Sequence, residues 1–442
     1  MIRIQHSSEL GRGFFAERGV EQSSDVVRDV LSQVKQRGDD ALRELATRFD
    51  EASPHELAVR EQTLLCAAGK LKQQNPALYD AICYSRDQAL RFAQKQRECF
   101  VDFEVEIAPG VFAGQRNIPV ERAGLYVPAG RFPLVSTVVM TSSPAVAAGV
   151  KDVILCSPPK KDPAGGDEPF CDQKIMAAAW LCGIKRVFAC GGSQAIAAMA
   201  VGTQTIPRVD VIAGPGNKFV AEAKRLVFGS VGIDMIAGPT EVFIIADETA
   251  DPTWLAADLL AQAEHDVLAQ PVLALPSESL AHKVADEIER QLEALATKEV
   301  ARQSIDGCGL IIVTESLDEA ARIANEKAPE HLELAMAAGE KREEVQAMLH
   351  NFGSLFVGHS SAEVLGDYSA GINHTLPTSG SARFSGGLSV RSFLKTVTTL
   401  SSDPSKEGYR KAASVAATLG EAEGLAAHAQ AARLRLEGGQ AQ

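Results

Sequence analysis

From about Gly110 onward, short β-rich runs alternate with helical runs, and this alternation is the strongest constraint on the fold. Four strand-like segments, each followed by a glycine or proline turn, come first: AGLYVP, DVILCSP, RVFACGG and VDVIAGPG. Helix-like segments lie between or after them: STVVMTSSPAVAAG, QKIMAAAWLCG, SQAIAAMAVG and NKFVAEAKRLVFG. Strands joined by helical crossovers form a parallel sheet. The sequence therefore predicts an α/β protein with a Rossmann-like parallel sheet.

A second alternation of the same kind follows the first. Its strand-like segments are TEVFIIAD, PVLALPS, GLIIVTE and GSLFVG, and its helical segments include DPTWLAADLLAQAEHD and SLAHKVADEIERQLEALA. Two blocks with the same alternation of strand-like and helical segments predict two Rossmann-like domains with a cleft between them. Such clefts are where α/β proteins usually bind ligands.

The two ends of the chain have a different, helical pattern. Near the start, the stretch ending in DDALRELATRF and the stretch NPALYDAICYSRDQALRFAQKQR carry apolar residues at helical spacing. The last stretch, SKEGYRKAASVAATLGEAEGLAAHAQAARLRL, is helical and alanine-rich, with too few large apolar residues for its own core. We therefore expect a helical region over 1–125 that contributes to the first domain, sheet domains over 126–238 and 239–388, and a helical arm over 389–442.

Composition excludes several classes of function. The net charge is −13, and no basic stripe is interleaved with aromatics, so nucleic-acid binding is not expected. No segment approaches the roughly 20 apolar residues that cross a bilayer, and the start lacks a secretory pattern, so we expect a cytoplasmic protein without a membrane contact. None of the eight cysteines forms a CxxC pair. A metal would therefore need nitrogen and oxygen ligands.

One strand-to-helix turn is a candidate anion site. Gly214-Pro215-Gly216-Asn217 ends one strand-like run and opens a helix, where free N–H groups favour a phosphate or carboxylate. A simple tight turn is an equally good interpretation of this string alone. Gly191-Gly192-Ser193-Gln194 stands at the equivalent place one unit earlier, which favours a binding role slightly.

Polar residues of catalytic type occur at two further places. Gln262 and His265 are three apart near a helix end, so they share a face and could share a metal, although a solvated helix end is the usual explanation of such a pair. Glu330 and His331 are both proton-shuttle types. Neighbours on a regular strand face opposite sides, so one site for both needs a bend or a helix start at Pro329.

The remaining candidates lie near the C-terminus. Asp367 and His374 belong to a loop-like segment, GDYSAGINHTLPT, of the kind that carries function on a rigid scaffold. Glu423 and His428 are five apart on what we expect to be the final helix, where a regular helix would point them in different directions. Taken alone, these last two have the character of surface residues.

Taken together, these segments resemble the histidinol dehydrogenase family. The matching strings, in the family's order, are GLYVP, LCSPP, GGSQAIAAMAVGT, DVIAGPGNKFV, AGPTEVFIIAD, DLLAQAEHD, APEHLEL, GDYSAGINHTLPT, ARFSGGLSV and SKEG. They run from about Gly124 to the C-terminal helix, and the helical N-terminus also fits. Ordered motifs over most of the chain are far more specific than any one of them.

The resemblance implies a set of site residues. One Zn²⁺ per subunit is held by Gln262, His265, Asp367 and His428. The acid/base pair is Glu330 and His331, and NAD contacts fall on Tyr126, Gln194 and Asn217 within the first sheet domain. Substrate contacts fall on Thr240, Gln262, His265, His331, Asp367, Glu423 and His428.

The resemblance also implies the reaction and the assembly. Histidinol, a small amino alcohol, is oxidised by NAD through histidinal to histidine, in the last steps of histidine biosynthesis. His331 takes the hydroxyl proton and Glu330 activates water, while zinc orients the substrate. The C-terminal helix reaches into a neighbouring subunit, so we expect a homodimer with shared active sites that Glu423 and His428 complete.

One position departs from the family pattern. The sequence has AGPTE where the family commonly has AGPSE, so Thr240 replaces a substrate-contacting serine. ARFSGGLSV and LKTVT also resemble relatives that oxidise other small polyols, such as sulfopropanediol dehydrogenases. Thr240 keeps the hydroxyl, and Glu423 is present as the partner of a substrate amine. The prediction is therefore histidinol, with another small polar diol as the alternative.

Overall fold

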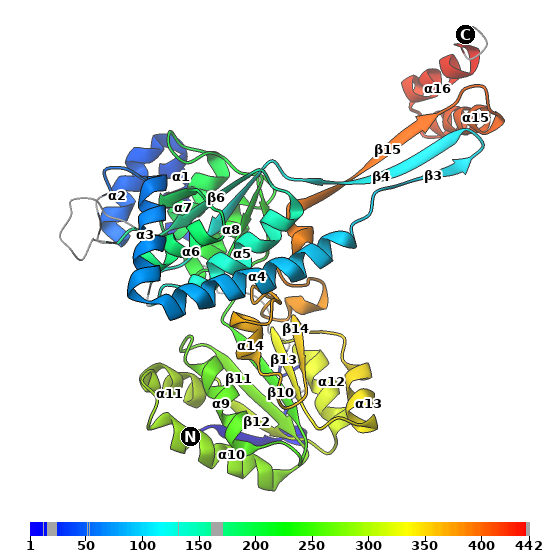
Figure 1. Ribbon diagram of the computed structural model, residues 1–442. Helices are drawn as coiled ribbons and strands as arrows, with labels where there is room; N and C mark the ends of the chain where they lie inside the picture. Colours follow the sequence, from blue (N-terminus) through cyan, green and yellow to red (C-terminus); the bar gives the residue numbers. More distant parts are fainter. Residues whose placement is uncertain are drawn as a thin grey trace. The chain divides into compact units, whose positions relative to one another are not determined.

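The computed structural model describes residues 1–11, 13–15, 24–50, 52, 54–130, 132–160 and 171–438. These residues form two compact units, which we describe separately (Figure 1). Unit 1 comprises Met1–Lys95 and Glu121–Phe393, and unit 2 comprises Gln96–Val120 and Leu394–Gln442. Within the described residues, we find no helix with both the length and the apolar character that crossing a bilayer requires.

The first sheet of unit 1 has the strand order β2-β7-β6-β5-β8-β9. Its strands are β2 (Ala58–Val59), β5 (Arg122–Tyr126), β6 (Asp152–Ser157), β7 (Arg186–Ala189), β8 (Val211–Ala213) and β9 (Gly232–Ile233). All neighbours are parallel except β2, which pairs antiparallel with β7. The chain leaves β5 towards β6 and β7 on one side, then returns to β8 and β9 on the other. The sheet therefore has a topological switch point between β5 and β8.

Helices cover this sheet as the alternating pattern predicts. The crossovers are α5 (Val135–Ala148), α6 (Gln173–Leu181), α7 (Gly192–Val201) and α8 (Lys218–Val227). The N-terminal helices are α1 (Ser24–Arg37), α2 (Asp39–Phe49), α3 (Glu61–Gln74) and α4 (Pro76–Glu98). The long helical pattern near the start is broken into α1 and α2 at Gly38, whose φ of 58° suits glycine. Buried residues of α1 and α2 pack with α7 and α8 in one apolar core.

The second sheet of unit 1 is fully parallel, in the order β1-β12-β11-β10-β13-β14. Its strands are β1 (Arg3–His6), β10 (Glu241–Ala246), β11 (Gln270–Leu275), β12 (Leu310–Val313), β13 (His331–Ala335) and β14 (Ser354–Val357). Its helices are α9 (Pro252–Ala263), α10 (Glu278–Leu292), α11 (Lys298–Gly307), α12 (Leu317–Lys327), α13 (Glu340–Met348) and α14 (Glu363–Tyr368). Short 3-10 turns are η1 (Ser7–Glu9), η2 (Ser381–Arg383) and η3 (Val390–Phe393).

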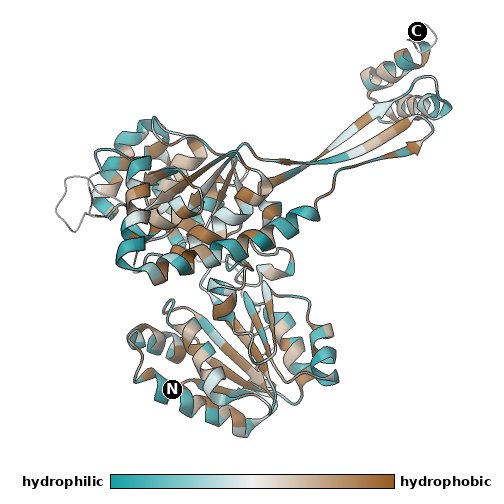
Figure 2. Ribbon diagram, in the orientation of Figure 1, coloured by the Kyte–Doolittle hydropathy of each residue, from teal (hydrophilic) through white to brown (hydrophobic). Residues whose placement is uncertain are grey.

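Much of the central strands of both sheets has the brown colour of apolar residues in Figure 2. All six residues of β10 are buried, which is the near-continuous apolar pattern of a strand covered on both faces. The predicted α/β fold with two Rossmann-like parallel sheets is therefore confirmed. The N-terminus differs from the helical prediction, because β1 forms an edge strand of the second sheet through its pairing with β12.

Unit 2 contains a sheet that the sequence analysis did not predict. Strands β3 (Phe103–Ala108), β4 (Val111–Pro119) and β15 (Leu394–Ser402) form an antiparallel sheet in the order β15-β4-β3. The chain then forms α15 (Glu407–Ala422) and α16 (Ala426–Gly438), which pack together. Phe103, Val105 and Ile107 alternate along β3 with Glu104 and Glu106, the period-2 pattern of a strand, although almost all residues of β3 are exposed.

Candidate active site

The acid/base pair predicted at residues 330 and 331 stands at the start of β13. Glu330 lies in a bend just before the strand, and His331 is its first residue. The bend removes the strict alternation of a strand, so the two side chains approach each other, with His331 Nδ1 3.8 Å from Glu330 Oε2. Both residues are buried. Of the two geometries that the sequence left open, the structure has the bend.

Backbone atoms of Glu241 hold both members of the pair. The Glu241 N–H donates to Glu330 Oε2 at 3.0 Å, and the Glu241 carbonyl oxygen lies 2.9 Å from His331 Nδ1. A carbonyl only accepts hydrogen bonds, so Nδ1 carries the ring proton and Nε2 keeps its lone pair. Nε2 is buried and has no hydrogen-bond partner among the described residues. Burial lowers the pKa of His331 to about 3, which favours this neutral, proton-accepting form.

The surroundings of Glu330 shift its pKa in the opposite direction to that of His331. Burial raises the pKa of Glu330 well above its ordinary value, while hydrogen bonds from Thr240 and from the Glu241 N–H act to lower it. The Thr240 hydroxyl donates to Glu330 Oε2 at 2.6 Å, and its oxygen lies 2.6 Å from the Gln262 amide. Glu330 is thus a carboxyl group that takes up a proton readily.

Gln262 is fully buried, which excludes the solvated helix end as its explanation. It lies in the last turn of α9, whereas His265 follows two residues after the helix ends. With its nitrogen towards Glu363, the amide donates to both carboxylate oxygens at 2.6 and 3.1 Å. Its oxygen then accepts from the Thr240 hydroxyl and from the Glu241 N–H. Glu363 is a site residue that the sequence analysis missed.

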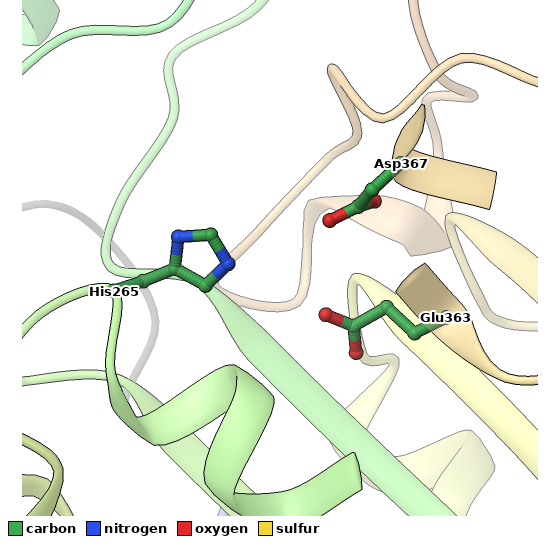
Figure 3. Close-up of side chains that lie close together, drawn as sticks. All are labelled: His265, Glu363 and Asp367. Atoms are coloured by element: carbon green, nitrogen blue, oxygen red, sulfur yellow. The ribbon is translucent and has the colours of Figure 1, made fainter. Parts of the chain in front are cut away.

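His265, Glu363 and Asp367 form a cluster that could hold a metal ion. One ligand atom from each lies within 4.8 Å of the others, and Figure 3 shows the imidazole facing the two carboxylates. Glu363 and Asp367 are buried on α14, four residues apart, so they share one face of that helix. His331 Nε2 lies 3.8 Å from Asp367 Oδ1, which places the acid/base pair beside the cluster.

The chemistry of this cluster fits a divalent cation such as zinc. Imidazole and carboxylate groups are ordinary zinc ligands. Asp367 Oδ1 is buried without a hydrogen-bond partner among the described residues, and burial raises the pKa of Asp367 to about 7. A bound cation would relieve both conditions, because it contacts the free oxygen and favours the ionised carboxylate. His374 lies beside this group, with its ring hydrogen-bonded to the Asp367 backbone.

The three predicted NAD contacts lie at the carboxyl end of the first sheet. Tyr126 ends β5, and its hydroxyl accepts a hydrogen bond from the Gly192 N–H at 3.0 Å. Gln194 is buried in the first turn of α7. Asn217 caps α8, where its side chain accepts from the Phe219 and Val220 N–H groups.

The turn before Asn217 is tight. A Cβ on Gly214 would stand 2.1 Å from the Tyr126 carbonyl oxygen, so only glycine fits there. The structure therefore has the tight turn, while the anion site stays a prediction, because Asn217 and Asp234 already accept from the Phe219, Val220 and Gly214 N–H groups.

Glu423 and His428 both lie in unit 2 and are exposed. The prediction that they share one final helix is wrong. Glu423 caps the end of α15, His428 lies in α16, and Gly424 between them has φ of 75°. Left-handed glycine at this point ends a helix, which explains the break.

Comparison with known proteins identifies the family. The family described as histidinol dehydrogenase matches residues 16–436. The chain belongs to the histidinol dehydrogenase family. A histidinol dehydrogenase of Geobacillus kaustophilus is 44% identical over 430 residues, which are 96% of this chain and 96% of the relative. One from Aquifex aeolicus is 42% identical over 428 residues, or 96% of this chain and 94% of that protein.

A solved structure shows the same relationship in three dimensions. The crystal structure of histidinol dehydrogenase from Elizabethkingia anophelis matches with a TM-score of 0.89 at 35% identity, covering 99% of this chain and 98% of the other. The resemblance predicted from the ordered motifs and the prediction of a dehydrogenase are thereby confirmed at the level of the histidinol dehydrogenase family.

Proposed function

We propose that this protein oxidises L-histidinol through L-histidinal to L-histidine, with two molecules of NAD reduced per turnover. The observation that carries the proposal is the position of the Glu330–His331 pair beside Gln262, His265 and Asp367, in a chain of this family. The relatives are named histidinol dehydrogenase, which favours histidinol over the alternative small diol that Thr240 suggested.

The chain's own residues supply the proton chemistry. His331 Nε2 is a buried, neutral acceptor, suited to take the proton of the substrate hydroxyl while the carbon loses its hydride. Glu330 is suited to take a proton from water as the water adds to the aldehyde, because burial makes the carboxyl a better base. His331 returns its first proton to the aldehyde oxygen as the water adds, and then accepts a hydroxyl proton of the hydrated aldehyde in the second oxidation.

The bound groups complete this chemistry. Gln262, His265, Asp367 and His428 would hold one Zn²⁺, and bound zinc would anchor and orient the substrate for oxidation. Tyr126, Gln194 and Asn217 would bind NAD, which supplies the hydride acceptor. Thr240, hydrogen-bonded between Glu330 and Gln262, would contact the substrate.

We further propose a homodimer in which His428 and Glu423 complete the site of the partner. Three of the four proposed ligands belong to unit 1, whereas the fourth, His428, and the proposed substrate contact Glu423 are exposed on unit 2. The outward residues of α14, next to Asp367, are apolar and exposed: Val364 by 37%, Leu365 by 46% and Tyr368 by 55%. An exposed apolar surface beside a polar site favours cover by another chain.

The test is NADH formed per histidinol consumed by the purified protein. We expect a ratio of two, and His331→Asn should lower kcat by about 10²–10⁴-fold with zinc content unchanged. His282→Asn is a matched control, because His282 is exposed on α10. Negligible turnover of histidinol, with turnover of another diol in a polyol panel, would overturn the assignment of the substrate.

A further inference from the structure

A carboxylate that the proposed mechanism does not use lies beside the proposed NAD contacts. Asp50 caps the C-terminal end of α2 and is half-buried. Its Oδ2 accepts a hydrogen bond from Gln194 Nε2 at 3.3 Å, although the two residues are 144 positions apart in the chain. Asp50 also contributes to the electrostatic environment of Tyr126. It therefore faces the same end of the first sheet as two residues expected to contact NAD.

The position of the Asp50 carboxylate is unfavourable for the folded state. Among the described residues, no lysine, arginine or histidine forms an ion pair with it, and Gln194 is its only side-chain hydrogen-bond donor. Burial raises the pKa of Asp50 to about 6, against the weaker lowering effect of Gln194. A partly buried carboxylate without a cation is unfavourable for folding, which makes a ligand-binding role the better explanation.

The first sheet lacks an acidic residue at the place where doubly wound folds usually bind the adenosine ribose. In doubly wound folds the dinucleotide binds at the switch point, and an acidic residue about 20 residues after the first βα turn binds the adenosine ribose. Here the second parallel strand, β6, ends at Ser157 and continues as Pro158, Pro159 and Lys160, none of which is acidic. Asp50 instead reaches Gln194, which follows β7, the direct neighbour of β6.

We propose that the Asp50 carboxylate binds the hydroxyls of the adenosine ribose and thereby selects NAD over NADP. A carboxylate has two acceptor oxygens and matches a vicinal diol, whereas the 2′-phosphate of NADP would meet a like charge and lose the donor. The Gln194 amide orients the carboxylate by donating to one oxygen, which leaves the other oxygen for the ribose. This inference rests on the proposed NAD site.

The test is direct binding of NADH and NADPH, followed by fluorescence, to the native protein and to Asp50→Asn. We expect the substitution to weaken NADH binding at least about tenfold, as loss of hydrogen bonds to a charged group does, and to improve NADPH binding relative to NADH. In steady state, KM for NAD should rise while kcat changes little. An unchanged ratio of NADH to NADPH affinity would overturn the proposal, whatever happens to either affinity alone.

Control variants separate this inference from the proposed NAD site. Glu44→Gln removes an exposed carboxylate from the same helix and should leave both affinities unchanged. Asn217→Ala should weaken NADH and NADPH alike if the site is where we place it. Weakening by Asn217→Ala with no effect of Asp50→Asn would refute the role of Asp50 alone. No effect of Asn217→Ala would instead refute the NAD site. Asp50→Ser provides a second, smaller substitution should Asp50→Asn fold poorly.

Discussion

Glu363 links the proposed zinc ligands to the rest of the site. It receives the Gln262 amide at 2.6 Å and lies 3.8 Å from His331 Nδ1. Such a group fixes the orientation of an amide, since the Gln262 nitrogen that donates to the carboxylate turns the oxygen to the opposite side, towards Thr240 and the Glu241 N–H. We therefore assign Glu363 to orienting Gln262, whether or not it also contacts the ion.

Removing this carboxylate gives a first prediction. Glu363→Ala should weaken zinc retention by about 10–100-fold, because the Gln262 amide loses the partner that orients it. Competition with a chelator of known affinity measures the change. Glu343→Ala, on the exposed face of α13, is the control and should retain zinc as the native protein does. Equal zinc affinity in the two variants would contradict the assigned role.

The raised pKa of Asp50 gives a second prediction, about stability. An acid whose folded-state pKa is raised from 3.8 to about 6 destabilises the folded state once it ionises, so the penalty is present above pH 6 and absent below 3.8. Asp50→Asn should therefore stabilise the protein without NAD by about 1 kcal/mol at pH 8, the value being reduced for partial exposure. Thermal unfolding at pH 8 and pH 4 measures this, and a gain of equal size at both would contradict it.

At the residue scale, local sequence patterns predicted some site residues and missed others. Gln262 with His265, and Glu330 with His331, are close in the chain and of catalytic type, so the sequence pointed to them. Glu363 could have been predicted from its spacing, since it precedes Asp367 by four positions and shares its helix face. No local sequence pattern indicates Asp50, since its partner Gln194 is 144 residues away and only the folded chain brings the two together.

At the scale of elements, the turn from β8 to α8 is secured by a buried ion pair. Asp234 accepts from the Gly214 N–H at 2.7 Å, and Lys224 Nζ donates to the Gly214 carbonyl at 3.1 Å. The two side chains also pair with each other, and they are 2% and 0% exposed. Both hydrogen-bonding groups of Gly214 are thus fixed, so the helix start that carries Asn217 has a defined position.

This pair gives a third prediction. Lys224→Met leaves Asp234 buried without its cation and should cost about 3–5 kcal/mol of unfolding free energy. The double variant Lys224→Met with Asp234→Asn removes both charges and should recover much of that stability. It should still bind NADH more weakly, because the Gly214 carbonyl oxygen has lost its hydrogen bond from Lys224. Denaturant unfolding and NADH titration separate the two effects, and native NADH affinity in the double variant would contradict the positioning role.

Element prediction succeeded for the short apolar strands that alternate with helices, and failed for β1 and for the antiparallel sheet, although β3 carries the alternating pattern of a strand. The strands β5 to β8 and β10 to β12 are short apolar runs between glycine or proline turns, and each was predicted. β1 is only four residues long and is partly exposed, so nothing local distinguishes it from a loop. The sheet of β3, β4 and β15 joins segments almost 300 residues apart, which no local pattern can indicate.

At the scale of the whole molecule, the proposed sharing of sites between subunits is open to a mixing test. His331→Asn and His428→Ala should each be inactive alone. If His428 serves the partner's site, a dimer of one variant with the other has one intact site and one with both changes. Random exchange of subunits in an equal mixture should then restore about a quarter of native activity. Activity that stays at the level of the single variants after exchange would show that each chain uses its own His428.

The two contacts that Glu241 makes through its main chain do not depend on its side chain. No point substitution can delete a carbonyl or an N–H other than by proline, so the anchors of Glu330 and His331 survive any ordinary change at position 241. They depend instead on the alignment of β10 with β13, where Val242 pairs with His331. The geometry of the Glu330–His331 pair therefore follows from the sheet register, whatever side chain stands at position 241.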